Sequence, residues 1–232
     1  MKILIFGATG LAGGSVLKAC LVAPVIDEVR VITRRPVCLK HNKLREFVHN
    51  DFLNYSGVGD AFAGVDACLF CLGVSAMQVS GKNEYRRITH DITLAAAQEL
   101  KKSSPSAIFH YISGQGTHGN SHFMWARVKA ETEQELIKFM HSACWRPSFI
   151  DAEASVSSPR LFKVLQPALK LLKPFNRFYV EGQDLGRAMI QATIENIHGR
   201  VIENAEIREI ASRYIRSLSK KGSGHHTVLT KK

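Results

Sequence analysis

Three glycines near the start of the chain are spaced in a way that suits phosphate binding. Gly7, Gly10 and Gly13 follow the apolar residues 3–6 and lead into a segment of helical periodicity. The N-terminus of a helix offers unpaired N–H groups and a positive dipole end to an anion. We expect Gly7 to permit the turn, Gly10 to leave room for phosphate and Gly13 to let the helix pack closely. The pattern predicts a dinucleotide site, rather than a plain glycine-rich turn, with a loop that includes Thr9, Leu11 and Ala12.

The residues after the second expected strand bear on which dinucleotide binds. An acidic residue at this point would accept hydrogen bonds from the ribose hydroxyls of NAD, but this chain has Arg34 and Arg35 there. Two guanidinium groups suit the adenosine 2′-phosphate. The pair therefore predicts NADP(H), with NAD(H) as the less favoured cofactor. A solvated basic turn is the alternative interpretation.

Two further strand ends carry residues suited to the same ligand. Asp51, at the end of the third expected strand, has a carboxylate that can accept a hydrogen bond from the adenine amino group, although an Asx turn is nearly as good an interpretation. Gly73 closes a buried strand, where a small residue lets a ribose approach the sheet.

Cysteine and histidine spacings do not predict a metal or redox site. Cys68 and Cys71 form a CxxC within an apolar strand, where residues three apart face opposite sides. His118 and His122 are four apart, but the glycine and asparagine between them argue against a helix start, so we expect two polar loop histidines. We expect no bound metal, and reduced thiols at all five cysteines: Cys20, Cys38, Cys68, Cys71 and Cys144.

The elements that must position these residues alternate along the chain. Apolar β-rich runs alternate with segments of helical periodicity, which is typical of a parallel sheet with right-handed crossovers. The sequence predicts an α/β protein: a single-domain, doubly wound Rossmann fold with a mostly parallel sheet. Strands are expected at residues 3–6, 29–32, 47–48, 67–72, 108–112, 142–145 and 201–202, and helices at 11–22, 83–102, 121–141 and 183–196.

Length and charge bound the organisation of the chain. Its 232 residues, 45% of them hydrophobic, suit one core. We expect a cofactor-binding domain at 1–212, with a small substrate or lid region at about 151–182, and a basic, mobile tail at 213–232. The tail holds six of the eleven net positive charges, which leaves a net charge of +5 for residues 1–212. Because that part also contains no RNA- or DNA-binding motif, we expect no nucleic-acid partner.

Residues 161–173 combine lysines with leucines. A lid helix over the substrate cleft is the favoured interpretation, and a helix lying on an anionic membrane surface is the alternative. No apolar run approaches the length of a membrane span, and the start of the chain lacks the pattern of a secretory signal. We therefore expect a cytoplasmic protein, either a monomer or a homodimer.

Taken in order, these motifs resemble the atypical short-chain dehydrogenase/reductase superfamily, and within it the Tat-interacting-protein oxidoreductase branch, which binds NADPH. The resemblance spans roughly residues 1–210 and includes the glycine loop, Arg34-Arg35, Asp51, Cys71-Leu72-Gly73, Tyr111-Ile112-Ser113-Gly114, Lys129 and Arg146-Pro147-Ser148. It implies an oxidoreductase acting on a small carbonyl substrate. It also implies cofactor contacts around the later strand ends, at Asp51, Phe52, Cys71, Leu72, Gly73, Lys129, Pro147 and Ser148.

The catalytic positions depart from the pattern of that family. There, a serine at the end of the fifth strand and a tyrosine in YxxxK polarise and protonate a carbonyl, while the lysine lowers the tyrosine pKa and holds the nicotinamide ribose. Here Trp125 takes the tyrosine position before Lys129, and the serine position falls on Gly114, one residue after Ser113. An indole N–H donates a hydrogen bond but cannot act as the general acid. The catalytic candidates are therefore Ser113 and Lys129.

Two functions are compatible with this departure. The first is an NADP(H)-dependent oxidoreductase in which water or another hydroxyl supplies the proton. The second is a weakly active or inactive NADP(H)-binding sensor that acts through a protein partner. Sugar-nucleotide epimerisation is disfavoured because it needs the same tyrosine. The substitute hydroxyls within the expected domain are those of Tyr85, Tyr111, Thr117 and Ser121.

Overall fold

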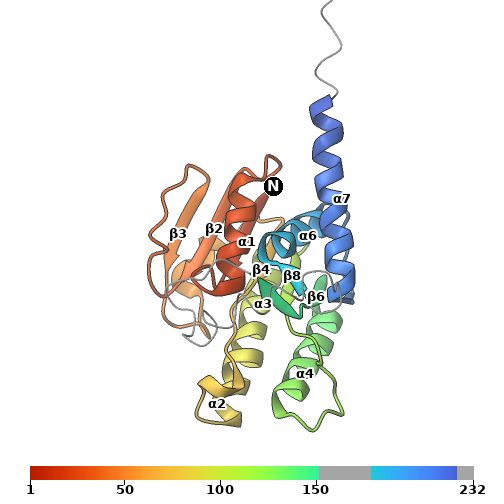
Figure 1. The fold of residues 1–232 in the computed structure, drawn as a ribbon. Helices are drawn as coiled ribbons and strands as arrows, with labels where there is room; N and C mark the ends of the chain where they lie inside the picture. Colours follow the sequence, from red (N-terminus) through yellow and green to blue (C-terminus); the bar gives the residue numbers. More distant parts are fainter. Residues whose placement is uncertain (152–178, 224–232) are drawn as a thin grey trace, which may run out of the picture.

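A seven-stranded parallel sheet forms the centre of the molecule. The computed structural model describes residues 1–151 and 179–223, and Figure 1 shows the sheet with helices packed around it. The strand order is β3-β2-β1-β4-β5-β6-β9, so the chain winds outward from β1 in one direction and then in the other. This order confirms the doubly wound Rossmann fold. The strands are β1 (Lys2–Phe6), β2 (Glu28–Thr33), β3 (Leu44–Val48), β4 (Ala67–Phe70), β5 (Ile108–Ile112), β6 (Ser142–Arg146) and β9 (Arg200–Glu203).

Helices cover both faces of this sheet because its strands are apolar on both sides. Along β1, Ile3 and Ile5 join the core beneath one layer of helices, while Leu4 and Phe6 join the core beneath the other. The first layer consists of α1 (Leu11–Val22), α6 (Gly182–Ile194) and α7 (Asn204–Ser223). The second consists of the 3₁₀ helix η1 (Ser56–Ala61) with α3 (Ile92–Ser103) and α4 (Met124–Phe139).

Several short elements complete the described chain. The helix expected at 83–102 is divided into α2 (Lys82–Arg86), a π-helical turn η3 (Arg87–Asp91) and α3, preceded by a 3₁₀ turn η2 (Ala76–Gln78). The extra residue of a π turn shifts the register of the apolar stripe, which sequence periodicity does not reveal. A small parallel pair, β7 (Phe149–Asp151) and β8 (Tyr179–Glu181), was too short to predict.

The C-terminal segment differs from its expectation. A mobile tail was predicted from residue 213, yet α7 continues as a helix to Ser223. Its buried apolar stripe packs in the core beside α6, and Arg213 pairs with Glu195 at 2.8 Å. A helix nucleated by such packing propagates into the polar sequence beyond it. The buried residues of the stripe are Ile207, Ile210, Ala211 and Tyr214. Residues 224–232, and most of the predicted lid region at 151–182, lie outside the described residues.

The turn between β1 and α1 is the tightest junction of the fold. Gly7 has a φ of +74°, and a β-carbon there would lie 2.7 Å from the backbone carbonyl carbon of Cys71, just after β4. A β-carbon on Gly13 would lie 2.1 Å from the Gly7 carbonyl oxygen. Both glycines therefore allow backbone to touch backbone, as their spacing predicted.

Replacing Gly13 tests this junction. We expect Gly13→Ala to lower the free energy of unfolding by at least about 2 kcal/mol, because the added methyl meets backbone that cannot move aside. Gly14→Ala is the matched control. Its β-carbon would lie 3.4 Å from the Ala8 carbonyl oxygen, and alanine in a helix gains about 0.5–1 kcal/mol over glycine. Urea unfolding followed by circular dichroism measures both, and equal stabilities would contradict this account.

Candidate functional site

The predicted site residues follow the carboxyl ends of six parallel strands. Those strand ends meet at one edge of the sheet, and the strand order reverses between β1 and β4, where ligands bind in folds of this class. The glycine loop follows β1 and the two arginines follow β2. The remaining residues follow β3 through β6: Asp51, Phe52, Cys71, Leu72, Gly73, Ser113, Pro147 and Ser148.

The start of α1 fits a phosphate group. Gly10 is the N-cap residue and makes no side-chain capping bond, and the first turn contains no acidic residue. The Gly10 amide donates to the Gly7 carbonyl at 2.9 Å, which closes the turn. Thr9 is exposed, and Leu11 and Ala12 are half-buried. Unpaired amides at a helix N-terminus with no competing carboxylate are suited to hold a pyrophosphate.

The turn after β2 presents two exposed arginines. Thr33 holds this turn, because its hydroxyl donates to the Arg35 carbonyl at 2.8 Å and accepts from the Arg35 amide at 3.4 Å. Arg34 and Arg35 have exposed side chains. A fixed backbone with two exposed guanidinium groups suits a phosphate monoester.

The structure gives Asp51 and Phe52 local roles. The Asp51 carboxylate accepts a hydrogen bond from the Leu53 amide at 3.1 Å, which is the Asx turn that was the alternative interpretation. Phe52 is buried against Phe6, with ring centroids 6.1 Å apart. Both residues therefore stabilise the turn after β3.

Strand β4 ends at Phe70, two residues earlier than predicted, so Cys71 follows it directly and Gly73 lies two residues further on. The Cys71 amide still donates to the Phe6 carbonyl at 3.1 Å. Cys68 lies in one core and Cys71 packs against the other, so the expectation that this CxxC faces opposite sides is confirmed. Burial raises the pKa of the Cys68 thiol, which is the behaviour of an inert core cysteine.

Three polar groups meet at the end of β5. The hydroxyls of Ser113 and Thr117 are 3.1 Å apart and buried, and the Lys129 ammonium donates to the Ser113 carbonyl oxygen. Burial lowers the pKa of Lys129 to about 8, against a smaller upward effect of the Glu133 carboxylate. One hydroxyl proton is used between Ser113 and Thr117, so the pair retains one O–H to donate to an acceptor oxygen.

Gly114 and Trp125 stand where the resemblance implies a serine and a tyrosine. A β-carbon on Gly114 would lie 3.6 Å from the Lys129 nitrogen, so this position borders the amine. Trp125 lies one helical turn before Lys129 on α4, and its ring would be 3.5 Å from a β-carbon on Gly116. The indole therefore borders the loop that carries Ser113 and Thr117.

Of the four substitute hydroxyls, the structure places Thr117 beside Ser113. Tyr85 and Tyr111 are buried, and burial raises the pKa of each phenol. Ser121 accepts a hydrogen bond from the Phe123 amide at 3.1 Å and so shapes the loop before α4. Thr117 is consequently the hydroxyl best placed to act with Ser113.

Asn204 ties together the loops beside this cluster, and sequence analysis did not find it. Its side chain accepts from the Ser148 amide at 2.8 Å and donates to the Tyr179 carbonyl at 3.2 Å. Pro147 accepts from the Gln115 amide at 3.0 Å, which joins the loops after β5 and β6. The available signal was an asparagine directly after the last expected strand, since buried amides order neighbouring backbone.

Glu133 carries a buried negative charge on the same helix as Lys129. Arg146, at the end of β6, binds it with two hydrogen bonds of 2.9 and 2.6 Å and also contacts Glu203 at 2.9 Å. This bidentate pair fixes α4 against the sheet. Its position also makes Glu133 the carboxylate that favours the charged form of Lys129.

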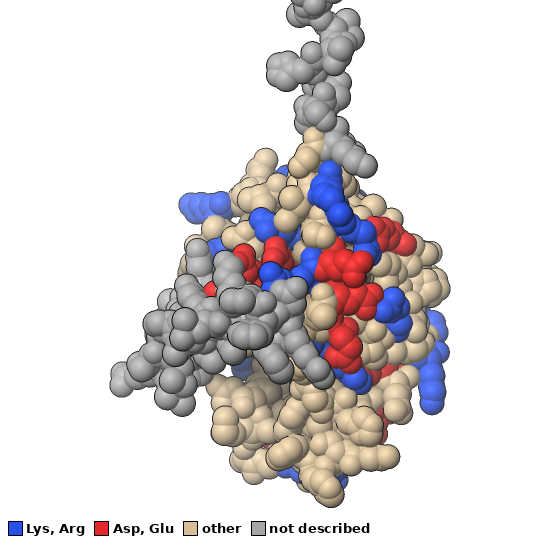
Figure 2. Space-filling view, turned by 45° about the vertical axis from the view of Figure 1, so that its right-hand side comes forward, with Lys and Arg blue, Asp and Glu red and all other residues tan. Residues whose placement is uncertain are grey.

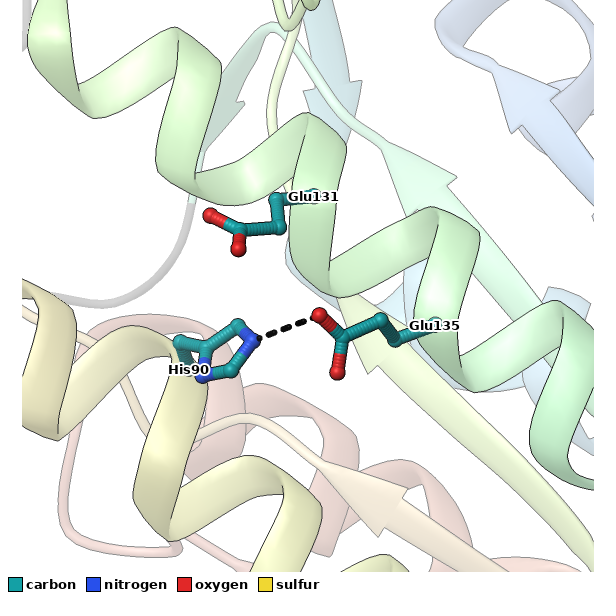
Figure 3. A group of neighbouring side chains, drawn as sticks. All are labelled: His90, Glu131 and Glu135. Atoms are coloured by element: carbon teal, nitrogen blue, oxygen red, sulfur yellow. Dashed lines mark hydrogen bonds and ion pairs between the residues drawn. The ribbon is translucent and has the colours of Figure 1, made fainter.

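A second polar cluster joins η3 to α4, away from the strand ends. Figure 3 shows His90 with Glu131 and Glu135, whose ligand-type atoms all lie within 4.8 Å of one another. Arg86 binds Glu131 with two hydrogen bonds, and Asp91 lies 2.8 Å from His90. His90 also lies 3.2 Å from a Glu135 carboxylate oxygen, so hydrogen bonds and an ion pair join α2 and η3 to α4 here.

Comparison with known families decides the ancestry of this site. The model of the NAD dependent epimerase/dehydratase family matches residues 3–138, from β1 through the glycine loop to α4. The chain belongs to this family. The resemblance to nicotinamide-dependent dehydrogenases of the short-chain class is thereby confirmed.

The chain is also similar to fungal proteins and to solved structures. "Protein FMP52, mitochondrial" of Candida albicans is 24% identical over 215 residues, covering 87% of this chain and 91% of that protein. "Leucinostatins biosynthesis cluster protein T" of Purpureocillium lilacinum is 29% identical over 177 residues, covering 73% and 65%. The Bordetella bronchiseptica enzyme WbmF, solved with NAD⁺, has a TM-score of 0.67 at 13% identity, covering 100% of this chain and 82% of that chain. The last likeness shows the shared fold.

The expected cytoplasmic location is wrong. Relatives in Candida albicans, Saccharomyces cerevisiae and Eremothecium gossypii are all named as mitochondrial proteins. The expectation rested on the lack of a secretory pattern, and that pattern concerns a different route from mitochondrial import. Among residues 1–151 and 179–223, no helix is long and apolar enough to cross a bilayer.

The charge state of Lys129 can be measured directly. In protein labelled with ¹³C-lysine, we expect one side-chain resonance to titrate near pH 8, because burial disfavours the ammonium, instead of near the ordinary 10.5. Lys129→Met should remove that resonance. Lys138→Met, at an exposed position on the same helix, should leave it in place. Titration of every lysine near 10.5 would show that the amine is solvated.

Proposed function

We propose that this protein is an NADP(H)-dependent oxidoreductase that acts on a small carbonyl compound. The observation that carries the proposal is the uncapped glycine turn at the N-terminus of α1, followed after the next strand by two exposed arginines. The family supports a nicotinamide cofactor, and the arginines are our reason for choosing NADP(H) over NAD(H).

Residues after β1, β2 and β4, together with Lys129 on α4, bind the cofactor in this proposal. The amides of the glycine loop hold the pyrophosphate, and Arg34 and Arg35 hold the 2′-phosphate. Gly73 leaves space for the ribose, since a β-carbon there would meet no atom within 4 Å. Lys129 donates to the nicotinamide ribose with its remaining ammonium protons. Bound in this way, the cofactor supplies a hydride to the substrate carbon.

The proton that completes the reduction comes from the cluster at the end of β5. The free hydroxyl proton of the Ser113–Thr117 pair polarises the carbonyl oxygen. Lys129, with a pKa near neutrality, is the adjacent proton source in place of the missing tyrosine. Because no phenol stands at residue 125, we propose slow turnover rather than an efficient reductase.

A second function is favoured by the same two departures, Gly114 and Trp125. Both can be tolerated if the chain binds NADP(H) as a sensor and signals through a protein partner. Binding does not require the tyrosine, because the glycine loop and the arginines lie on other elements. Substrate turnover therefore separates the two functions.

Cofactor choice is tested by titrating the purified protein with NADPH and NADH while following nicotinamide fluorescence. We expect NADPH to bind at least about tenfold more tightly, and Arg34→Ala/Arg35→Ala to remove that preference, since each guanidinium–phosphate contact is worth about 1.5–3 kcal/mol. Arg45→Ala is the matched control. That arginine is exposed on β3, with its guanidinium over the ring of Phe47 at 4.9 Å.

Two results would contradict the proposal in different ways. Binding of NADPH that is insensitive to the double substitution would assign the 2′-phosphate to other residues. Failure of both nucleotides to bind would remove the cofactor site, and the oxidoreductase function with it.

Turnover is tested by adding aldehydes and ketones to the NADPH-bound protein and following absorbance at 340 nm. With the natural protein, we expect slow oxidation of the bound NADPH, stoichiometric with reduction of the carbonyl compound. Trp125→Tyr/Gly114→Ser should increase the rate by about 10²–10⁴, because it restores a phenol and a serine beside Lys129. Lys129→Met in that background is the control and should abolish the gain. A sensor would bind NADPH without oxidising it in the natural protein.

A further inference from the structure

We propose that Phe123 and Trp125 form an aromatic wall of the substrate site, and that the substrate presents a flat, uncharged aromatic or conjugated group to it. This inference rests on the proposed oxidoreductase function and specifies its substrate class. It also gives a role to the tryptophan that replaces the expected tyrosine.

The first argument is position. Trp125 lies one turn before Lys129 on α4, and its ring packs over Gly116, whose φ is +85°. Gly116 belongs to the loop between Ser113 and Thr117. The indole therefore adjoins the group of donors that we assign to the carbonyl oxygen, so a substrate bound there must pass beside it.

The second argument is the exposed ring of Phe123. This side chain is 66% exposed, yet its ring stacks on Trp125 with centroids 6.3 Å apart and planes 24° from parallel. A stacked pair with an open face offers a further aromatic group the same favourable contact. Exposed apolar surface beside a polar cluster is typical of a binding site.

The backbone beneath this pair is held in place before any ligand arrives. The Phe123 carbonyl accepts from the amides of Ala126 and Arg127 at 3.2 and 3.3 Å. The Arg127 guanidinium donates to the carbonyls of Ser121 and His122 at 2.6 and 2.9 Å. A prepared surface loses little conformational entropy on binding.

The third argument is the lack of charged residues in two loops beside the wall, since the nearby Arg127 guanidinium already binds two backbone carbonyls. The loops after β4 and β5, residues 71–81 and 113–126, contain no Asp, Glu, Lys or Arg. On the face that Figure 2 shows, the lower end of the molecule carries few charged side chains (largely tan). Figure 1 places α2 and the start of α4 at that end. A substrate bearing its own diphosphate needs cations to hold it. These two loops suit an uncharged substrate instead.

The chain offers a spectroscopic test, because it has two tryptophans in different settings. Trp145 is fully buried and donates to His110 at 3.1 Å, whereas Trp125 is half-buried at the proposed wall. A ligand that stacks at the wall should therefore change the emission of Trp125 alone. The difference between the natural protein and Trp125→Phe gives the part of the fluorescence emission that comes from Trp125.

We would titrate the full chain with 2-acetylnaphthalene, an uncharged aryl ketone, with and without NADPH. Saturable quenching is expected, and Phe123→Ala should weaken the affinity about five- to tenfold through loss of one stacked face. Phe139→Ala is the matched control, because that phenylalanine is exposed at the far end of the same helix. Its affinity should equal that of the natural protein. UDP-glucose should produce no saturable change.

The outcomes separate this inference from the function on which it rests. Equal affinity of Phe123→Ala and the natural protein, non-saturable quenching, or tighter binding of UDP-glucose would each overturn the aromatic wall, even when NADPH binds. Failure of NADPH to bind would overturn the proposed function. The ketone titration without NADPH still decides the wall in that case, and thermal unfolding of Phe123→Ala shows that the exposed substitution leaves the fold intact.

Discussion

Close contact between three backbone segments governs this protein. The turn after β1, the first residues of α1 and the chain after β4 approach so closely that two positions tolerate no β-carbon. This contact places the N-terminus of α1 at the point where the strand order reverses, and it directs the amides of that helix toward one edge of the sheet. The arginines after β2 and the donors after β5 reach the same edge because all seven strands are parallel.

The group of side chains at the end of β5 lacks the phenol that the resemblance implies. A half-buried lysine, two hydroxyls and an indole remain, and burial lowers the lysine pKa to about 8. Compared with a phenol, the Trp125 indole has a larger apolar surface but cannot act as a general acid. In the proposed function, the residue that stands in place of the phenol thus provides binding area for a flat ligand. The glycine loop and the two arginines lie on other elements, so the proposed cofactor site does not include residue 125.

The alternation of apolar strands and periodic helices predicted seven strands of the sheet, and the glycine spacing predicted its tightest turn. The sequence predicted neither the π turn at Arg87–Asp91 nor the helix α7, whose second half was expected to be a mobile tail. Both depend on neighbours: the π turn packs against α4, and α7 is ordered by its apolar stripe on α6. Periodicity within one segment carries no information about a surface supplied by another.

The sequence by itself determined the fold class, the place of the dinucleotide loop and the absence of a tyrosine before Lys129, because each depends on residue types at short, fixed spacings. Only the tertiary structure decided that Thr117 pairs with Ser113, that Asn204 joins the loop after β6 to β8 and that Phe123 stacks on Trp125. It also decided the burial that shifts the pKa of Lys129. Side-chain contacts and desolvation arise between segments, so they exist only once the chain has folded.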